Sequence, residues 1–331
     1  MIRLKKITQS PYITLVHSMD FVGFALRMRR NGLTTRLNRK RIHYLPITAW
    51  SLEKASNLIK TVTQCHLFRL ILPNHRIIRL CNTPRERTLL RLFGAPAAFI
   101  NHNIFANEHV FVPGNGKQEH DAIYNAKFQP FKRHWLAKEI NSLALLSYCV
   151  GRSYNFNKQY FDQMASVLKH AATLNFDWAS NYTFWGRKKV CAGLASAKVG
   201  LCLSAIEGAM VSSIEYLLCG MPVVSTESRG GRDIYFDERY TVITRDTPES
   251  VRDGVAEVIA RNISPDTIRA STLTRLSEHR NSFVNLIAGI HKDEGATDIP
   301  SSWEEVFHDD PDERLAVEEL EESAFVRELI S

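Results

Sequence analysis

Short apolar runs alternate with segments of helical periodicity along most of the chain. Compact apolar runs predict buried strands, and apolar residues that recur at intervals of three and four predict helices. The expected strands are residues 13–16, 41–45, 76–81, 97–100, 122–125, 144–150, 199–203 and 221–225. The expected helices are residues 52–63, 84–93, 132–142, 157–171, 211–219, 247–261 and 266–290. Because strands that alternate with helices form parallel sheets, we expect an α/β fold.

The length of 331 residues suits two domains. The glycine- and proline-rich stretch 113–116 is the best candidate for a linker between them. We therefore expect a short N-terminal domain at 1–116, a second domain at 117–296 and an acidic C-terminal tail at 297–331. Gly220 follows the helix at 211–219, where a left-handed residue commonly ends a helix.

Composition narrows the class of protein but indicates no chemistry. The sequence is 44% hydrophobic and 23% charged, which is typical of soluble globular proteins and excludes fibrous or fully disordered ones. The six cysteines occur singly, without a C-x-x-C pair, so their spacing indicates reduced thiols and neither a zinc site nor a redox motif. No apolar run approaches the roughly 18 residues that a membrane-spanning helix needs, so we expect a cytoplasmic protein.

The charge is unevenly distributed. The net charge is +7, yet residues 301–331 carry eleven acidic and two basic residues, which leaves the rest of the chain strongly basic. In residues 1–60, twelve Lys and Arg side chains face only Asp20 and Glu53. Such a surface attracts the phosphates of nucleotides, anionic lipids or nucleic acid, or it is simply a solvated basic face. Because no nucleic-acid-binding motif accompanies the charge, nucleic acid is not expected as a partner.

Two carboxylates stand out between the strands at 199–203 and 221–225. Glu207 lies in the turn after the first strand, and Glu215 follows after seven intervening residues on the predicted helix. If this helix begins near Met210, its free N–H groups and positive dipole end form an anion site beside Glu207. Glu215 then reaches the same cavity from the helix face, or else lies on an exposed helical turn.

This arrangement resembles the E-x7-E motif of retaining GT-B glycosyltransferases, family 4 (glycosyl transferases group 1). The resemblance covers about residues 119–290 and includes the Ser-x-x-Glu-Gly turn, the Gly-x-Pro-Val-Val strand and the Gly-Gly loop that follows. It implies two Rossmann-like domains with parallel sheets facing a central cleft. It also implies that Glu207 contacts the donor sugar as a catalytic residue, and that Glu215 binds the ribose hydroxyls of the nucleotide.

The upstream segment 124–134 resembles the loop in which this family grips the donor diphosphate with a basic pair. Lys127 stands where the family usually has arginine, Lys132 follows it, and the resemblance implies that both lysines are catalytic residues together with Glu207. Either Lys127 or Arg133 could be the partner of Lys132, and the alternative is a basic helix start that faces solvent. Two cations suit this chemistry because the departing nucleoside diphosphate gains negative charge.

The resemblance also implies donor contacts elsewhere in the second domain. Gly208 and Ser212 flank the start of the helix at 211–219, and Gly230 with Gly231 permits close backbone approach to a ligand, although a simple turn is the alternative. The aromatic residues of 178–185 could stack on the nucleotide base or belong to the core.

In the first domain, three residues follow predicted strands and are acceptor-side candidates. They are His17, His102 and Asn103. Ligands of open α/β sheets gather at the carboxyl ends of the strands, whereas a lone histidine there can also be structural. The segment Asp310-Pro311-Asp312 spells a D-x-D metal motif, but it lies in the acidic tail with no apolar strand before it. We therefore expect neither a metal nor another cofactor.

Together these features predict a hexosyltransferase-type, metal-independent glycosyltransferase. It would transfer a sugar from a nucleotide-sugar donor to a hydroxyl, with retention. The basic N-terminal region fits peripheral contact with an anionic membrane at the inner face of the cell, where a glycan or lipid-linked acceptor for bacterial surface polysaccharide would be met. The alternatives are a sugar-nucleotide epimerase or hydrolase of the same fold, and a catalytically inactive nucleotide-sugar-binding protein.

Overall fold

The computed structural model describes residues 2–48, 50–151, 156–307 and 318–330. The chain divides into two compact units: unit 1 is Met1–Phe105 with Ser277–Ser331, and unit 2 is Ala106–Leu276. These bounds differ from the expected ones. The stretch 113–116 lies inside unit 2, and the C-terminal segment belongs to unit 1 instead of forming a separate tail.

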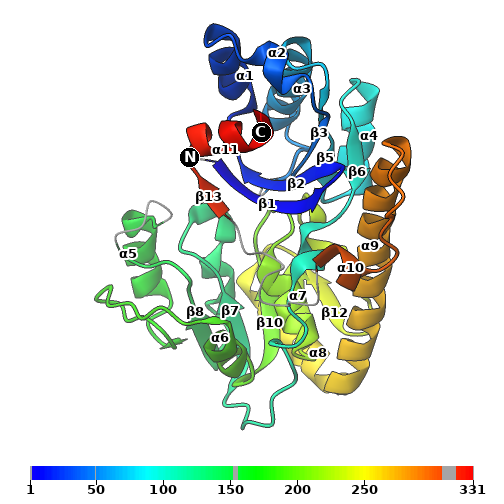
Figure 1. Ribbon diagram of the computed structural model, residues 1–331. Coiled ribbons are helices and arrows are strands. Elements are labelled where there is room, and N and C mark those ends of the chain that lie inside the picture. Colours follow the sequence, from blue (N-terminus) through cyan, green and yellow to red (C-terminus); the bar gives the residue numbers. More distant parts are fainter. Residues whose placement is uncertain (1, 49, 152–155, 308–317, 331) are drawn as a thin grey trace. The chain divides into compact units, whose positions relative to one another are not determined.

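Unit 1 contains a five-stranded mixed sheet in the order β13-β1-β2-β3-β4 (Figure 1). Its strands are β1 (Ile2–Gln9), β2 (Tyr12–Ser18), β3 (Ile42–Pro46), β4 (His75–Ile77) and β13 (Glu318–Leu320). The strands β2, β3 and β4 are parallel, but β1 is antiparallel to both of its neighbours. The expected parallel arrangement is present in β2, β3 and β4, and the basic segment before residue 13 adds the antiparallel strand β1.

The strand expected at 76–81 is two short strands. Its first part, β4, pairs with β3, and its second part, β5 (Arg79–Cys81), forms a separate parallel pair with β6 (Ala97–Phe99). The change of partner occurs at Ile78, whose N–H donates to the Tyr44 carbonyl at 2.9 Å, while the next N–H donates to Pro96.

The helices of unit 1 are α1 (Phe21–Arg30), α2 (Thr34–Leu37), α3 (Ala55–Ile71), α4 (Pro84–Leu92), the 3₁₀ helix η1 (His102–Phe105), α10 (Trp303–Phe307) and α11 (Glu322–Ile330). Side-chain caps begin two of these helices. The Asp20 side chain accepts from the N–H of Gly23 at the start of α1, and the Thr83 side chain accepts from the N–H of Glu86 at the start of α4. The core of this unit combines aliphatic and aromatic side chains. Phe21 and Phe68 pack edge-to-face at 5.3 Å.

The acidic C-terminal segment completes unit 1. The strand β13 pairs with β1, and Glu319 lies 3.1 Å from the Arg3 side chain. In α11, Glu322 accepts from Arg27 at 2.6 Å, and Phe325 is fully buried. The acidic residues therefore neutralise part of the basic N-terminal region.

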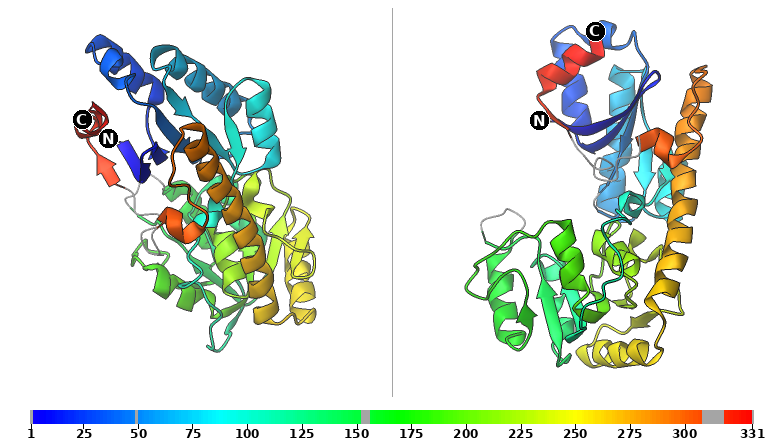
Figure 2. Two further views of the ribbon diagram at one scale, coloured as in Figure 1. Left: turned by 45° about the vertical axis from the view of Figure 1, so that its right-hand side comes forward. Right: turned by 60° about the horizontal axis from the view of Figure 1, so that its bottom comes forward.

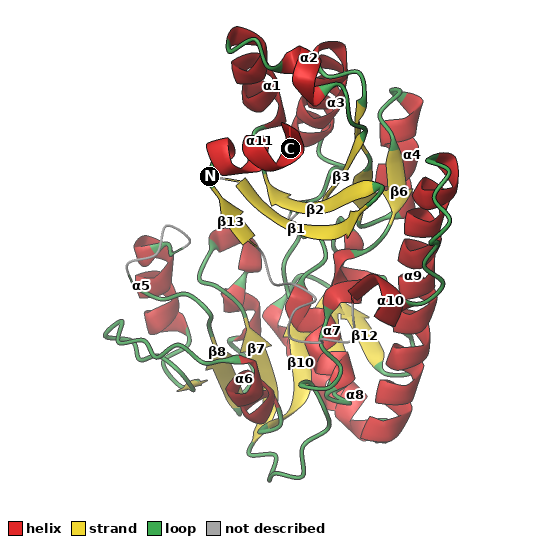
Figure 3. Cartoon of the chain, viewed as in Figure 1, coloured by secondary structure: helices red, strands yellow, loops and turns green. Residues whose placement is uncertain are grey.

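Unit 2 contains a six-stranded parallel sheet in the order β12-β11-β10-β7-β8-β9 (Figure 3). Its strands are β7 (His120–Asn125), β8 (Leu143–Leu146), β9 (Ala172–Thr173), β10 (Ala197–Cys202), β11 (Val223–Thr226) and β12 (Thr241–Thr244). The chain first forms β7, β8 and β9, which make one half of the sheet, and then β10, β11 and β12, which make the other half. Because β7 and β10 are neighbours, their carboxyl ends form the topological switch point at which doubly wound sheets bind ligands.

The helices of unit 2 are α5 (Lys158–Val167), α6 (Arg187–Leu194), α7 (Val211–Leu218), α8 (Pro248–Ala260) and the 3₁₀ helices η2 (Pro130–Lys132), η3 (His134–Ala137) and η4 (Gly231–Asp233). The long helix α9 (Pro265–Asp293), which Figure 2 shows from two further sides, contains the boundary between the units. No described helix is long and apolar enough to span a membrane. Gly220 has a φ of +71° after α7, as expected.

The helix expected at 132–142 is wrong. The two short 3₁₀ helices η2 and η3 lie there, with Arg133 between them at a φ of +52°. A left-handed residue cannot continue a right-handed helix, and this one redirects the chain directly after Lys132.

Candidate functional site

A buried ion pair lies at the switch point of unit 2. Lys132 ends η2 after β7, and Glu207 lies in the loop after β10; the Lys132 ammonium contacts Glu207 Oε1 directly. Their exposed fractions are only 5% and 7%. A charge buried this deeply is costly unless it is paired, so the two loops hold one another in place. Two of the three residues expected to be catalytic, Lys132 and Glu207, are thus brought together across 75 positions of sequence.

Buried aromatic residues position the loop that carries Lys132. The Tyr124 hydroxyl donates to the Lys132 carbonyl at 2.6 Å. The neighbouring His134 ring stacks on Phe128 with centroids 4.5 Å apart. Burial, reinforced by the charge of Lys132, lowers the pKa of His134 to about 3, so this histidine is neutral at physiological pH.

The helix α7 is fixed to the end of β7 by two hydrogen bonds and packs against β10 through the Tyr216 ring. The Tyr216 hydroxyl accepts from the N–H of Asn125 at 2.7 Å, and the Ser212 hydroxyl donates to the carbonyl of the same residue at 3.0 Å. Gly200 makes this packing possible, because a Cβ there would lie 2.4 Å from the Tyr216 ring. Ser212, which was expected to contact the nucleotide sugar, thus anchors the start of α7 to the loop that carries Lys132.

Lys127 lies in the same neighbourhood. Burial lowers its pKa, the charge of Lys132 lowers it further, and Glu207 partly opposes both effects. The ammonium groups of Lys127 and Lys132 lie 5.7 Å and 5.5 Å from the ring centre of Phe131. Two cations and one carboxylate therefore share this part of unit 2, an environment that favours an anionic ligand.

Arg133 makes contacts that differ from those of Lys127 and Lys132. Its guanidinium donates to Leu203 O, Thr226 Oγ1 and Asp246 Oδ2, each at 2.6 Å. These groups lie at or just beyond the carboxyl ends of β10, β11 and β12, so Arg133 braces this edge of the sheet. Of the two alternatives left by the sequence, Lys127 is the cation that shares the surroundings of Lys132 and Glu207.

The loop after β11 pairs with the Glu207 loop through backbone hydrogen bonds. The N–H of Glu207 donates to Arg229 O at 3.0 Å, and the N–H of Gly231 donates to Gly208 O at 2.6 Å. Gly230 has a φ of +107°, a conformation that glycine adopts without strain. The N–H of Gly231 is therefore already bonded within the protein.

A fully buried arginine that the sequence did not single out holds these loops. Arg232 donates through Nη1 to Cys202 O at 2.9 Å and Ser204 O at 2.7 Å, and through Nη2 to Thr226 O. Its Nε also donates to Asp233 at 2.6 Å. A single arginine in a loop gives no sequence signal of burial, which is why this residue was missed.

The helix α7 begins at Val211, after Met210 with a φ of +45°, as the sequence predicted. Glu215 lies one turn farther along and is half-buried. Its protein surroundings exclude water and raise the pKa of this carboxyl to about 7, an effect that the positive charge of Arg187 opposes. Glu215 therefore changes protonation close to neutral pH.

The aromatic residues of 178–185 divide between core and surface. Trp178 packs against Phe161 and Phe176 with ring centres 5.2 Å and 5.5 Å apart, so it belongs to a core cluster. Trp185 covers Gly193, whose absent Cβ would lie 2.7 Å from the indole. Phe184 is exposed.

In unit 1, the structure brings two of the acceptor-side candidates together. Burial lowers the pKa of His102 to about 4, and the proximity of His17 contributes to this shift. The Nε2 atom of His102 lies 3.2 Å from Leu80 O and 3.3 Å from Thr48 N. Asn103, the third candidate, is buried directly after it in η1.

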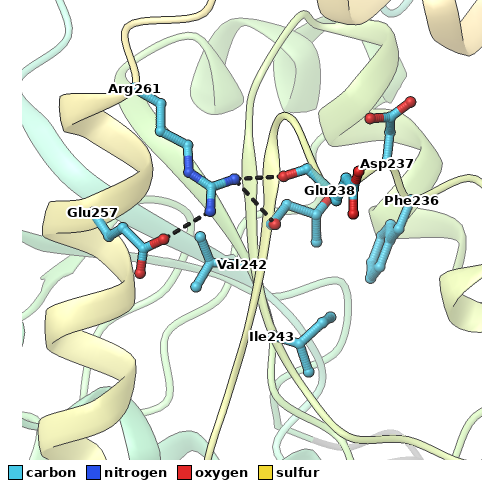
Figure 4. A pocket seen from close by; sticks show the side chains of 8 residues that line it. Phe236, Asp237, Glu238, Val242, Ile243, Glu257 and Arg261 are labelled. Atoms are coloured by element: carbon cyan, nitrogen blue, oxygen red, sulfur yellow. Dashed lines mark hydrogen bonds and ion pairs between the residues drawn. The ribbon is translucent and has the colours of Figure 1, made fainter.

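A separate cavity of about 430 Å³ lies beside the edge strand β12 and helix α8 (Figure 4). The Arg261 side chain lines this cavity and donates to Glu257 at 2.7 Å and to Glu238 O at 2.5 Å. The lining residues are Phe236, Asp237, Glu238, Thr241, Val242, Ile243, Glu257 and Arg261. None of the predicted donor residues is among them.

Within the described ranges, no three His, Cys, Asp or Glu side chains gather as metal ligands would. The segment Asp310-Pro311-Asp312 lies outside the described residues.

Comparison of the sequence with protein-family profiles gives no match, and comparison with curated protein sequences gives none either.

The fold, in contrast, is shared with solved glycosyltransferases. HepE from Anabaena, solved in complex with UDP, has a TM-score of 0.59 at 11% identity, with 84% of this chain and 78% of that chain covered. Sucrose-phosphate synthase from Thermosynechococcus elongatus has a TM-score of 0.53 at 14% identity, covering 81% and 69%. TarM has a TM-score of 0.54 at 12% identity, covering 82% and 60%. The chain therefore has the α/β fold of the GT-B glycosyltransferases.

Proposed function

We propose that this protein transfers a glycosyl group from a UDP-sugar to a hydroxyl of a glycan or lipid-linked acceptor, with retention of configuration. The observation that carries the proposal is the buried Lys132–Glu207 pair at the switch point of unit 2, beside the start of α7. The shared fold supports it, and HepE, one of the similar structures, was solved with UDP-glucose as well as with UDP and glucose.

The residues of unit 2 suggest a division of labour. Lys127 and Lys132 neutralise the diphosphate as it departs, a task for which positioned cations are effective in a site shielded from water. The first N–H groups of α7 face the same anion. Glu207, held by Lys132, contacts the donor sugar, and we infer that the transfer needs no metal ion.

Glu215 accepts hydrogen bonds from the ribose hydroxyls of the donor. An ionised carboxylate accepts more strongly than a protonated one, so donor binding should strengthen as the pH rises through the pKa of Glu215, about 7. The E215Q variant should bind UDP roughly 10- to 100-fold more weakly at high pH, because a hydrogen bond to a charged group contributes about 1.5–3 kcal/mol. It should also lose the dependence on pH. Titration calorimetry with UDP at about pH 6 and pH 8 measures both effects.

The matched control is Glu257→Gln on α8, which removes a carboxylate of the same unit that pairs with Arg261. This variant should bind UDP like the wild type at each pH. Wild-type affinity in E215Q would contradict the assignment of Glu215.

Product analysis distinguishes the transferase from its alternatives. A transferase consumes UDP-glucose in proportion to added acceptor, and the anomeric signal of its product shows retention. Donor turnover without acceptor would favour a hydrolase, and a changed sugar still attached to UDP would favour an epimerase. Binding without turnover across a panel of acceptors would identify an inactive nucleotide-sugar-binding protein.

We also propose that unit 1 contacts an anionic membrane through α3 and α4. These helices and the C-cap residue of α4, Phe93, expose five large apolar side chains, here named the α3–α4 surface: Ile59, Leu67, Leu70, Leu92 and Phe93. His66 Nε2 lies 2.8 Å from Phe93 O and joins the two helices. Their sequences carry five basic residues and one acidic residue, Glu86, which is buried. Exposed apolar side chains on helices that also carry basic residues suit insertion between anionic lipid headgroups.

Vesicle co-sedimentation tests this contact. The wild type should bind vesicles that contain phosphatidylglycerol more than vesicles of phosphatidylcholine alone, and added salt should weaken the binding. The double variant L70E/F93E should lose most of it, because it places two negative charges on the α3–α4 surface. Ile243→Glu, an exposed apolar position of unit 2, is the control and should bind as the wild type does. Equal binding to both vesicle types would exclude the proposal.

A further inference from the structure

Two thiols of unit 2 lie in direct contact. Cys191 lies on α6 and Cys219 is the C-cap of α7, and their sulfur atoms are 3.7 Å apart. Among the described residues, the structure records no other pair of thiols in contact. A disulfide has an S–S length of about 2.05 Å, so the sulfur atoms need to approach by roughly 1.6 Å. Rotation of two side chains with a small shift of α6 can supply a movement of that size.

The two thiols differ in chemical character. The hydrogen bond with Cys219, together with the charge of Arg269, lowers the pKa of Cys191. The same contact and burial raise the pKa of Cys219. Cys191 is therefore the thiol that ionises first, and the thiolate is the reactive form of cysteine. Both thiols are buried, and the Cys191 sulfur also lies 3.5 Å from Val112 O.

We propose that Cys191 and Cys219 form a reversible disulfide when hydrogen peroxide oxidises the protein, and that this bond fixes α6 to the end of α7. The Cys191 thiolate attacks one peroxide oxygen, the O–O bond breaks, and the departing hydroxide takes up a proton to become water. The Cys219 sulfur then attacks the sulfur of the resulting sulfenic acid. The S–O bond breaks, and the hydroxyl leaves as a second water with the proton of Cys219. Two thiols and one peroxide thus give one disulfide and two waters.

The position of this bond relates it to the donor site. Arg187 precedes Cys191 by one helical turn on α6, and Glu215 precedes Cys219 by one turn on α7, where Cys219 N–H donates to Glu215 O at 3.0 Å. The charge of Arg187 acts on Glu215. The disulfide would therefore fix the spacing of the two helices that carry this pair, a consequence for donor binding that rests on the proposed function.

Peptide mapping of the full-length protein tests the proposal. The protein is treated with hydrogen peroxide, unfolded, alkylated and digested. We expect one linked peptide pair that joins Cys191 to Cys219, that has lost two hydrogen atoms, and that dithiothreitol separates. The variant C219S should instead accumulate a sulfenic acid at Cys191 that dimedone labels, because the resolving thiol is missing. Cys65→Ser, which removes a buried thiol of unit 1, should leave the link intact.

The proposal is overturned if the oxidised wild type contains no Cys191–Cys219 link, either because both thiols are alkylated on unfolding or because another pair is joined. This result needs no variant, so it holds even where C219S fails to fold. It is also independent of UDP binding. Loss of the link would leave the proposed function intact, and failure of the transferase assays would leave the link unaffected.

Discussion

Replacing Lys132 with alanine is expected to reduce kcat by roughly 10²- to 10³-fold, the effect of removing one positioned group that stabilises transition-state charge. The substitution also leaves Glu207 buried without its cation, at an exposed fraction of 7%. Breaking a buried pair costs about 3–5 kcal/mol of unfolding free energy. Steady-state kinetics with a UDP-sugar and chemical denaturation measure the two effects separately.

Lys198→Ala is the matched control for this experiment. Lys198 on β10 pairs with Asp121 on β7 at 2.8 Å, so it joins the same two strands, but both side chains are 41% exposed. An exposed pair contributes at most about 1 kcal/mol, so this variant should keep its stability within that limit and its kcat unchanged. A Lys132→Ala enzyme with kcat within tenfold of the wild type would show that the buried pair is structural only. The double variant K132A/E207Q then separates the cost of the unpaired carboxylate from the loss of the cation.

Phe325→Ala is expected to lower the unfolding free energy of unit 1 by about 3–5 kcal/mol, the usual cost of truncating a buried aromatic side chain. Phe325 is fully buried, with its ring centre 6.1 Å from that of Phe24 and 6.5 Å from that of Tyr44. The removed ring leaves a cavity between α11 and the core of unit 1. Denaturation followed by circular dichroism should show the transition of this unit at lower denaturant concentration.

Phe184→Ala, at an exposed position of unit 2, removes the same atoms and should change stability by no more than about 0.5 kcal/mol. A loss below about 1 kcal/mol in Phe325→Ala would mean that α11 is not part of the core. The outcome therefore decides whether the acidic C-terminal segment is an integral element of unit 1.

Local patterns predicted the elements around the candidate donor site well. The strand before Glu207, the helix start near Met210 and the left-handed Gly220 are all confirmed, because each depends on residues a few positions apart. The roles of Glu207 and Glu215 depended on the resemblance and remain proposals.

Features set by distant contacts could not be predicted in this way. The spacing at 132–142 fits a helix, but Arg133 adopts a left-handed conformation and binds groups from three other segments. Arg232 is buried only because the carbonyls of two strand ends converge on it. The Cys191–Cys219 contact depends on how α6 packs beside α7. The acidic charge of the C-terminal segment likewise did not indicate that part of it pairs with β1 as the strand β13.

The pairing of β1 with β13 also determines the order in which the two units can fold during synthesis. Unit 2 is one continuous stretch of chain, so every residue of its core has left the ribosome before the last part of unit 1 is made. Unit 1 begins first but needs Glu318–Leu320 to pair with β1 and α11 to cover its hydrophobic core. Domains fold as units once their sequence is available. The nascent protein therefore acquires its candidate donor site before its N-terminal half is complete, and one edge of β1 stays unpaired until Glu318–Leu320 is available.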